Sequence, residues 1–220
     1  MRDVPAPDQP SSDGFAAACR ALGSTAPDPA LHAAAQDLRA RWGEPHRGYH
    51  DLEHLAEVLD HLTELDARTP AAVLAAWFHD AVYAGSAGDD ELASAVLATS
   101  VLNRLGVRAA GTDRVHELVL ATAEHEADPG DPERQALLDA DLAVLASHPD
   151  RYARYVAGVR REHRHLDDAE FSAGRLAVLR RLVARDPLFG TARGRQRWER
   201  AARANVRREI DGLLGPAPAD

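Results

Sequence analysis

Residues 71–83 read Ala-Ala-Val-Leu-Ala-Ala-Trp-Phe-His-Asp-Ala-Val-Tyr. Eight apolar residues precede the pair His79-Asp80 and three follow it, which predicts a helix buried nearly all round. A buried carboxylate beside a buried imidazole is costly unless both charges are compensated. A divalent cation would compensate both, and hydrogen bonds within the protein are the alternative. The segment therefore predicts a helix in the core of the protein that carries two polar residues, His79 and Asp80.

Helical patterns extend through most of the remaining chain. Leucines recur at a helical period, at Leu52, Leu55, Leu59, Leu62 and Leu65. Three helix starts are marked by an N-cap residue before a proline, in Asp28-Pro29, Thr69-Pro70 and Asp131-Pro132. No alternating strand with a hairpin turn is evident. We expect an all-α fold, with a flexible N-terminal tail over residues 1–14 and one compact domain of about eight to ten helices over residues 15–215.

The composition argues against several classes of protein. The formal net charge of the 220 residues is −9, which disfavours stable nucleic-acid binding. All 26 basic residues are arginine, so lysine nucleophiles and P-loops are excluded. The single Cys19 excludes an intrachain disulfide and fits a cytoplasmic location. No apolar run approaches the roughly 18 residues of a membrane span, so no membrane partner is expected. The functional groups that remain as candidates for chemistry are those of 11 histidines and 35 acidic residues.

Asp141 is a carboxylate in the middle of an apolar helical stripe. Its neighbours at i±3 and i±4 are all Leu or Val, surroundings in which a lone carboxylate is rarely tolerated. A metal ion would compensate it, and pairing with an arginine is the alternative. Asp139 lies about 200° round the same helix, so we expect it to cap or pair elsewhere.

Two further groups of histidines are candidates for the same site. Asp51 is a plausible N-cap, which would put His54 on the first helical turn and His50 just before it. If the helix begins earlier, the two histidines stand one turn apart and can face one ion. His125 follows the periodic residues of another helix and is expected to point inward.

Four blocks of sequence in this order resemble the HD-domain metal-dependent phosphohydrolases. They are Tyr-His-Asp-Leu-Glu-His at 49–54, Ala-Trp-Phe-His-Asp-Ala-Val-Tyr at 76–83, Glu-Leu-Ala-Ser-Ala at 91–95 and Leu-Asp-Ala-Asp-Leu-Ala-Val-Leu at 138–145. The longer strings are similar to an uncharacterised branch of bacterial predicted members. The resemblance extends from Trp42 to Glu209.

The resemblance implies a set of metal ligands. By this likeness His54 matches the first metal histidine, His79 and Asp80 the central pair, and Asp141 the closing aspartate. His50 has no general counterpart, so it is an extra ligand or, as we prefer, a substrate-binding phosphate contact. Two positions depart from the pattern, since His163 stands where Tyr is expected and Asp90 where Asn usually occurs. Neither of these is one of the four ligands.

Two histidines and two aspartates suit one divalent ion, such as Mn, Fe, Co, Ni, Zn or Mg. An ion of this kind activates water and polarises a phosphoryl group, so we expect an enzyme that hydrolyses phosphate esters. Glu91 and His125, together with Asp80, are candidate catalytic residues that orient water or protonate the leaving group. Arginines bind phosphate by paired hydrogen bonds, and the candidates are Arg160, Arg175 and Arg203.

The expected partner is a small phosphorylated substrate, a class that includes nucleotides, and self-association into a homo-oligomer is left open. One alternative is an HD-type iron-dependent oxygenase, which needs additional inward histidines between the central pair and the last aspartate. Because only His125 fits there, one metal is favoured over two. A second alternative is a non-catalytic metal or nucleotide sensor, and a purely structural helical protein would leave Asp141 unexplained.

Overall fold

The computed structural model describes residues 10–86, 88–126 and 128–215, and the regular elements in these ranges are all helices. In chain order they are α1 (Ser12–Ala21), α2 (Asp28–Trp42), α3 (Leu52–Glu64), α4 (Pro70–Phe78), α5 (Asp89–Arg104), α6 (Ala109–Ala121), α7 (Pro132–Leu142), the 3-10 helix η1 (Ala143–Ala146), α8 (Pro149–Glu162), α9 (Asp168–Val183) and α10 (Ala192–Leu214). The prediction of an all-α fold is confirmed. None of the described helices has the length and apolar character needed to cross a membrane.

The N-terminal boundary differs from the expected one. Helix α1 begins at Ser12, with the Ser11 hydroxyl accepting a hydrogen bond from the Asp13 amide. Residues 12–14, which were expected in the tail, are therefore the first turn of a helix. The earlier part of the predicted tail, residues 1–9, lies outside the described residues.

Two of the three predicted helix starts carry their caps. The Thr69 hydroxyl accepts from the Ala72 amide at the start of α4, and the Asp131 carboxylate accepts from the Arg134 amide at the start of α7. At α2 the prediction was wrong by one residue, because the cap position is Pro27 and Asp28 is already helical. The Asp28 carboxylate instead accepts from Arg20, with 2.6 Å between the two atoms.

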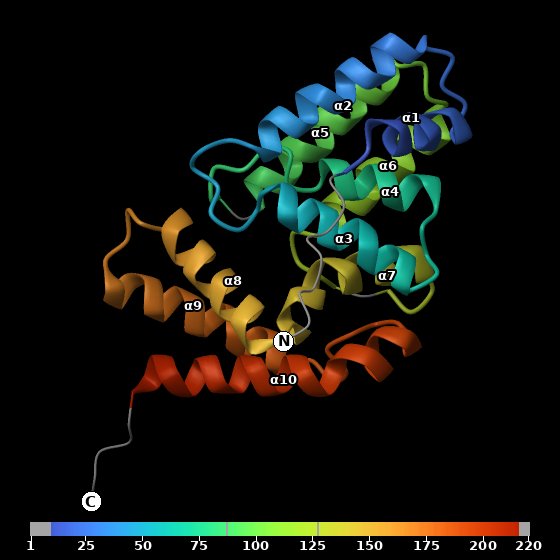
Figure 1. Ribbon diagram of the computed structural model, residues 1–220. Helices are drawn as coiled ribbons and strands as arrows, with labels where there is room; N and C mark the ends of the chain where they lie inside the picture. The colour runs from blue at the N-terminus through green and yellow to red at the C-terminus, as the bar shows by residue number, and fades with distance from the viewer. Residues whose placement is uncertain (1–9, 87, 127, 216–220) are drawn as a thin grey trace, which may run out of the picture.

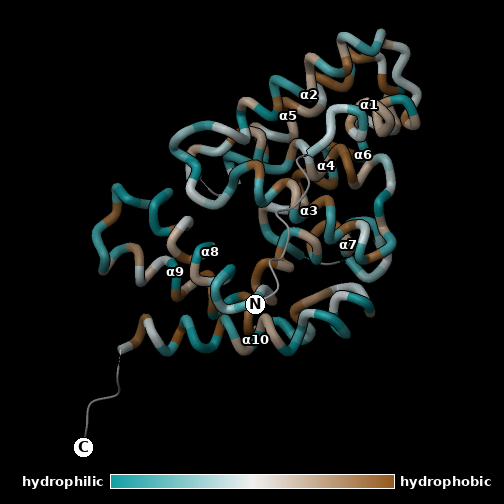
Figure 2. Tube along the Cα trace, viewed as in Figure 1, coloured by the Kyte–Doolittle hydropathy of each residue, from teal (hydrophilic) through white to brown (hydrophobic). Residues whose placement is uncertain are grey.

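Helix α4 is the centre of the fold. Every residue from 71 to 78 is buried, and α4 packs against α1, α3, α5, α6 and α7. Figure 1 shows α1 to α6 gathered on one side and α8, α9 and α10 on the other, with α7 and η1 joining them through contacts with α3 and α10. In Figure 2 the hydrophobic residues concentrate where these helices face one another.

The helix predicted over residues 71–83 ends earlier than expected, at Phe78, and His79 is its C-cap. The chain then turns, and the buried Arg47 side chain holds this turn. Its Nη1 donates to the Asp80 carbonyl at 2.8 Å, and its Nη2 donates to the Ala81 carbonyl at 3.4 Å. His79 and Asp80 therefore lie at a helix end and not in the middle of a helix.

Candidate metal centre

His54 lies on the first turn of α3, as the sequence predicts. The Asp51 carboxylate caps this helix and accepts from the amides of Glu53 at 2.9 Å and His54 at 3.3 Å. The ring of His54 is buried, with 1% of the residue exposed. Its Nδ1 is 2.9 Å from the Tyr49 hydroxyl oxygen. A proton on Nδ1 that is donated to this oxygen leaves Nε2 free to bind an ion.

His79 is oriented by the end of its own helix. Its Nδ1 donates to the Ala76 carbonyl at 2.8 Å, which again leaves Nε2 as the free nitrogen. The Trp42 ring packs beside it, with 5.3 Å between the ring centroids, and the Trp42 Nε1 donates to the Trp77 carbonyl. The imidazole is thus fixed by a hydrogen bond on one edge and by aromatic packing on its face.

Asp141 comes from the last turn of α7 and brings the third group to the same point. Its Oδ1 lies 3.0 Å from His54 Nε2 and 3.6 Å from His79 Nε2, and the two histidine nitrogens are 3.3 Å apart. Asp80 Oδ2 lies 3.3 Å from His79 Nε2 and 3.9 Å from His54 Nε2. Residues 54, 79, 80 and 141, far apart along the chain, therefore converge on one small region.

These separations fit a shared ion. Two ligands about 2.1 Å from one cation, at angles of about 90–110°, lie roughly 3.0–3.4 Å apart. Most of the separations in the cluster fall in or near that interval, and the donors are imidazole nitrogens and carboxylate oxygens. His54, His79 and Asp141 form a cluster that can hold a metal ion.

The charges in this cluster depend on one another. Burial raises the pKa of Asp80, but the neighbouring His79 outweighs it and lowers the pKa to about 2. Burial also raises the pKa of Asp141, and hydrogen bonds from His125, His54 and His79 bring it well below its usual value. Burial lowers the pKa of His79, while the two carboxylates raise it well above 6.5. Without an ion, positive charge on a histidine has to compensate the two buried carboxylates.

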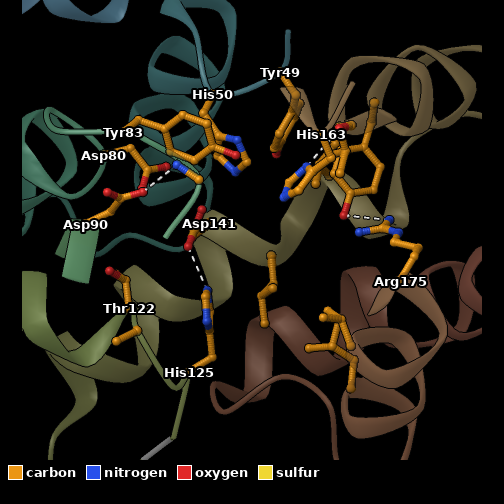
Figure 3. A pocket seen from close by; sticks show the side chains of 18 of the residues that line it. Tyr49, His50, Asp80, Tyr83, Asp90, Thr122, His125, Asp141, His163 and Arg175 are labelled. Carbon is orange, nitrogen blue, oxygen red and sulfur yellow. Dashed lines mark hydrogen bonds and ion pairs between the residues drawn. The ribbon is translucent and has the colours of Figure 1, made fainter. Parts of the chain in front are cut away.

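His125 points inward, as predicted, but from a turn and not from a helix. Helix α6 ends at Ala121, and His125 has a left-handed φ of 51°. Its Nε2 donates to Asp141 Oδ2 at 2.8 Å, so it contacts the carboxylate oxygen that faces away from the other histidines (Figure 3). The Arg185 guanidinium donates to the His125 and Glu124 carbonyls and fixes the turn.

His50 is held beside the cluster by Glu162 of α8. His50 Nδ1 donates to Glu162 Oε2 at 2.8 Å, and the Tyr83 hydroxyl donates to the same oxygen at 3.0 Å. The His50 and Tyr83 rings stack with 4.4 Å between their centroids. Burial lowers the pKa of His50, but the Glu162 carboxylate raises it overall. Sequence reasoning assigned no role to Tyr83 or Glu162, because their partners are distant in sequence.

A cavity of about 410 Å³ opens beside the cluster. His50, Asp80, His125 and Asp141 line one end of it, and Figure 3 shows Arg175 on the other side of the same space. Glu91 also lines the cavity, while its Oε2 accepts from the Gly88 amide at 2.5 Å and caps α5. Of the predicted ligands and catalytic candidates, all except His54 line this cavity, and the His54 ring contacts the ligands that do.

The three predicted phosphate-binding arginines have different positions. Arg175 lines the cavity, and it also binds Glu209 at 2.7 Å and the Tyr155 hydroxyl at 2.9 Å. Arg160 and Arg203 are not among the cavity-lining residues. Arg160 donates to the carbonyls at the end of α8, and Arg203 donates to those at the end of α9. Both guanidinium groups tie helix ends together, in place of the substrate contacts expected from the sequence.

Asp139 has the structural role predicted for it. Its Oδ1 accepts from the Gly190 amide at 2.7 Å, and its Oδ2 accepts from the amide and the hydroxyl of Thr191.

Asp90 and His163, the two positions that depart from the pattern of the HD-domain proteins that the sequence resembles, both line the cavity. Asp90 accepts from three consecutive amides of residues 84–86, and His163 Nδ1 donates to the Val159 carbonyl.

A scan of protein-family models and searches of curated proteins and solved structures found no match to this chain.

Proposed function

We propose that the chain is an HD-type metal-dependent phosphohydrolase, which cleaves a phosphate ester or a nucleotide with an activated water. The observation that carries this proposal is the convergence of His54, His79, Asp80 and Asp141 on one point, beside a cavity that the last three of them line. The order of these residues along the chain supports it, since the same order occurs in the HD-domain phosphohydrolases that the sequence resembles.

In this proposal those four residues hold one divalent ion, with Asp80 as the fourth ligand. The donor set suits Mn, Fe, Co, Ni, Zn or Mg. Such an ion, when bound, lowers the pKa of a water and polarises the phosphoryl oxygen. Two carboxylate ligands balance the charge of a divalent ion, which also removes the need for a protonated histidine in the cluster.

The side chains around the ligands supply positioning and protons. Tyr49 and the Ala76 carbonyl keep the two imidazoles oriented, and His125 keeps the Asp141 carboxylate turned toward them. His50 faces the cavity with its Nδ1 held by Glu162, so its Nε2 is available to bind a phosphate oxygen or to donate a proton to the leaving group.

The test compares two aspartates of one helix. Wild type, Asp141→Asn and Asp139→Asn are assayed for bound metal and for hydrolysis of p-nitrophenyl phosphate and nucleotides with Mn, Co, Ni and Mg in turn. We expect Asp141→Asn to lose both metal and turnover. Asp139→Asn, which alters a structural contact, keeps both once it is folded.

A folded wild type that binds no divalent ion refutes the proposal. Two iron ions per chain without phosphate hydrolysis would favour an oxygenase. Tight nucleotide binding without turnover with every metal would favour a sensor.

A further inference from the structure

An apolar stripe of α9 lines the cavity, and Arg175 and Arg181 of the same helix line it beside this stripe. Phe171, Gly174, Val178 and Leu182 follow one another at spacings of three and four residues, so they share one side of this helix. Val178 is 41% exposed although it is apolar. The face is therefore directed at the cavity, where a bound molecule could cover it.

Other helices continue this apolar wall. Leu142 from the end of α7, Val144 and Leu145 from η1, and Val159 from α8 line the same space. The candidate metal ligand Asp141 is adjacent to Leu142 in the chain. The polar cluster and the apolar wall therefore belong to one continuous cavity of about 410 Å³, a size typical of sites for small organic ligands.

The cavity offers little free positive charge for a chain of phosphates. Arg175 is paired with Glu209, and Arg185 donates to backbone carbonyls. Arg181 also lines the cavity but is exposed to solvent. On the other side, the carboxylates of Asp90 and Glu91 line the space and would repel additional anionic groups.

From these observations we infer that the substrate is a phosphate monoester of an apolar alcohol or phenol. Its phosphate lies at the His54–His79–Asp141 cluster and its organic group lies against the apolar face of α9. The inference rests on the proposed function. In the reaction a water oxygen forms the new bond to phosphorus and gives up a proton. The bond between phosphorus and the alcohol oxygen breaks, and the alcohol oxygen takes up a proton. The products are the alcohol and inorganic phosphate.

Gly174 gives a direct way to shorten the cavity. A Cβ added at Gly174 would meet nothing within 4 Å, so a larger side chain there would extend into the empty space that the residue lines. Gly212 is a matched control. It is also a helical glycine whose added Cβ would meet nothing within 4 Å, but it lies on α10 and is not among the cavity-lining residues.

The test compares ethyl and n-hexyl phosphate as substrates of the wild type, Gly174→Leu and Gly212→Leu, each full-length and loaded with the most effective metal. Burying one methylene corresponds to about a fourfold gain. We therefore expect kcat/KM of the wild type to be at least about tenfold higher for hexyl than for ethyl phosphate. Gly174→Leu should lose this preference, and Gly212→Leu should match the wild type.

Binding supplies a readout that does not need turnover. Calorimetric titration with ethylphosphonate and hexylphosphonate, which are not hydrolysed, should give the same preference for the longer chain in the wild type and its loss in Gly174→Leu. Such a result without hydrolysis of any phosphate would support the apolar site while refuting the proposed reaction. Equal affinities, or equal kcat/KM values, for the two chain lengths in the wild type would overturn the inference even if phosphatase activity is present. So would a Gly174→Leu variant that keeps the preference.

Discussion

Glu162 joins α8 to the loop that precedes α3, and its loss should affect stability and metal binding together. Its Oε1 accepts from the amides of Gly48 at 2.7 Å, Tyr49 at 2.7 Å and His50 at 2.9 Å. Its Oε2 accepts from His50 Nδ1 at 2.8 Å and from the Tyr83 hydroxyl at 3.0 Å. The Glu162 side chain is only 2% exposed, so water cannot easily replace it.

The substitution Glu162→Ala leaves three backbone N–H groups and two side chains without their acceptor. A buried polar group that loses its partner costs about 1–3 kcal/mol, and water entering the space left by the side chain recovers part of this. We expect a loss of about 4 kcal/mol in the free energy of unfolding, which lowers Tm by about 10 °C in a chain of this length. Glu162→Gln keeps a carbonyl oxygen for the amides and should lose about 1–2 kcal/mol.

The difference between wild type and Glu162→Gln should depend on pH. Burial raises the pKa of Glu162, but the hydrogen bond and charge of His50 and the backbone amides bring it well below 4.5. A carboxyl whose pKa is lower in the folded state stabilises the fold above its unfolded pKa, and this contribution is lost as the pH falls. The stability gap between the two proteins should therefore shrink below about pH 5, as Glu162 becomes protonated. It should also shrink as the pH rises through the raised pKa of His50, because the imidazole charge that Glu162 stabilises is then lost.

Urea denaturation at several pH values measures these free energies, and titration with Mn or Zn measures metal affinity. Glu170→Ala is the control, because its carboxylate also accepts a backbone hydrogen bond, from Asp167 at 3.0 Å, but in an exposed position. Glu170→Ala should lower the free energy of unfolding by less than about 1 kcal/mol. Because Tyr49, which contacts His54, is held by Glu162, Glu162→Ala should also weaken metal binding about tenfold. A variant with wild-type stability and metal affinity would refute the role assigned to this carboxylate.

Three further outcomes are expected. Tyr49→Phe removes the hydroxyl that contacts His54 Nδ1 and should weaken metal binding about tenfold, as titration would show. Because the buried His54 Nδ1 loses its partner, Tm should also fall by a few degrees in thermal melting. Gly48→Ala brings a Cβ against the Gly158 carbonyl oxygen and should cost about 3 kcal/mol in chemical denaturation. Burial lowers the pKa of His79 but neighbouring carboxylates raise it well above 6.5, so the metal-free chain should lose stability as the pH rises through this pKa. The metal-loaded chain, whose histidines are neutral, should not show this loss in the same measurement.

The sequence predicted most of the fold because its signals are local. Apolar residues at helical spacing and N-caps such as Thr69 and Asp131 mark helices without knowledge of the tertiary structure. The end of α4 was not predictable in this way. The run from 71 to 83 contains no Gly or Pro, and the turn after Phe78 is held by Arg47, which lies more than thirty residues earlier.

The site was predictable where a single helix decides the direction of a side chain. On α7 the angular separation of Asp139 and Asp141 distinguished a structural carboxylate from one in the cluster, and Asp139 does bind the turn at Gly190 and Thr191. The roles of arginines were not predictable, because Arg is abundant and each guanidinium can serve many partners. The contact of Glu162 with the loop at 48–50 spans more than a hundred residues and has no local signature.

The cluster lies at helix ends, and two consecutive residues, His79 and Asp80, serve one site there. On a continuous helix the side chains of His79 and Asp80 would diverge by about 100°. Helix α4 ends at Phe78, but His79 keeps helical dihedral angles (φ −55°, ψ −39°). Both side chains nevertheless reach the same region as His54 at the start of α3 and Asp141 at the end of α7. Contacts outside the cluster hold these ends, among them the Arg47 bonds to the turn after α4. A chain that keeps two carboxylates buried at such a junction needs positive charge there, and a divalent ion supplies it without protonating the histidines.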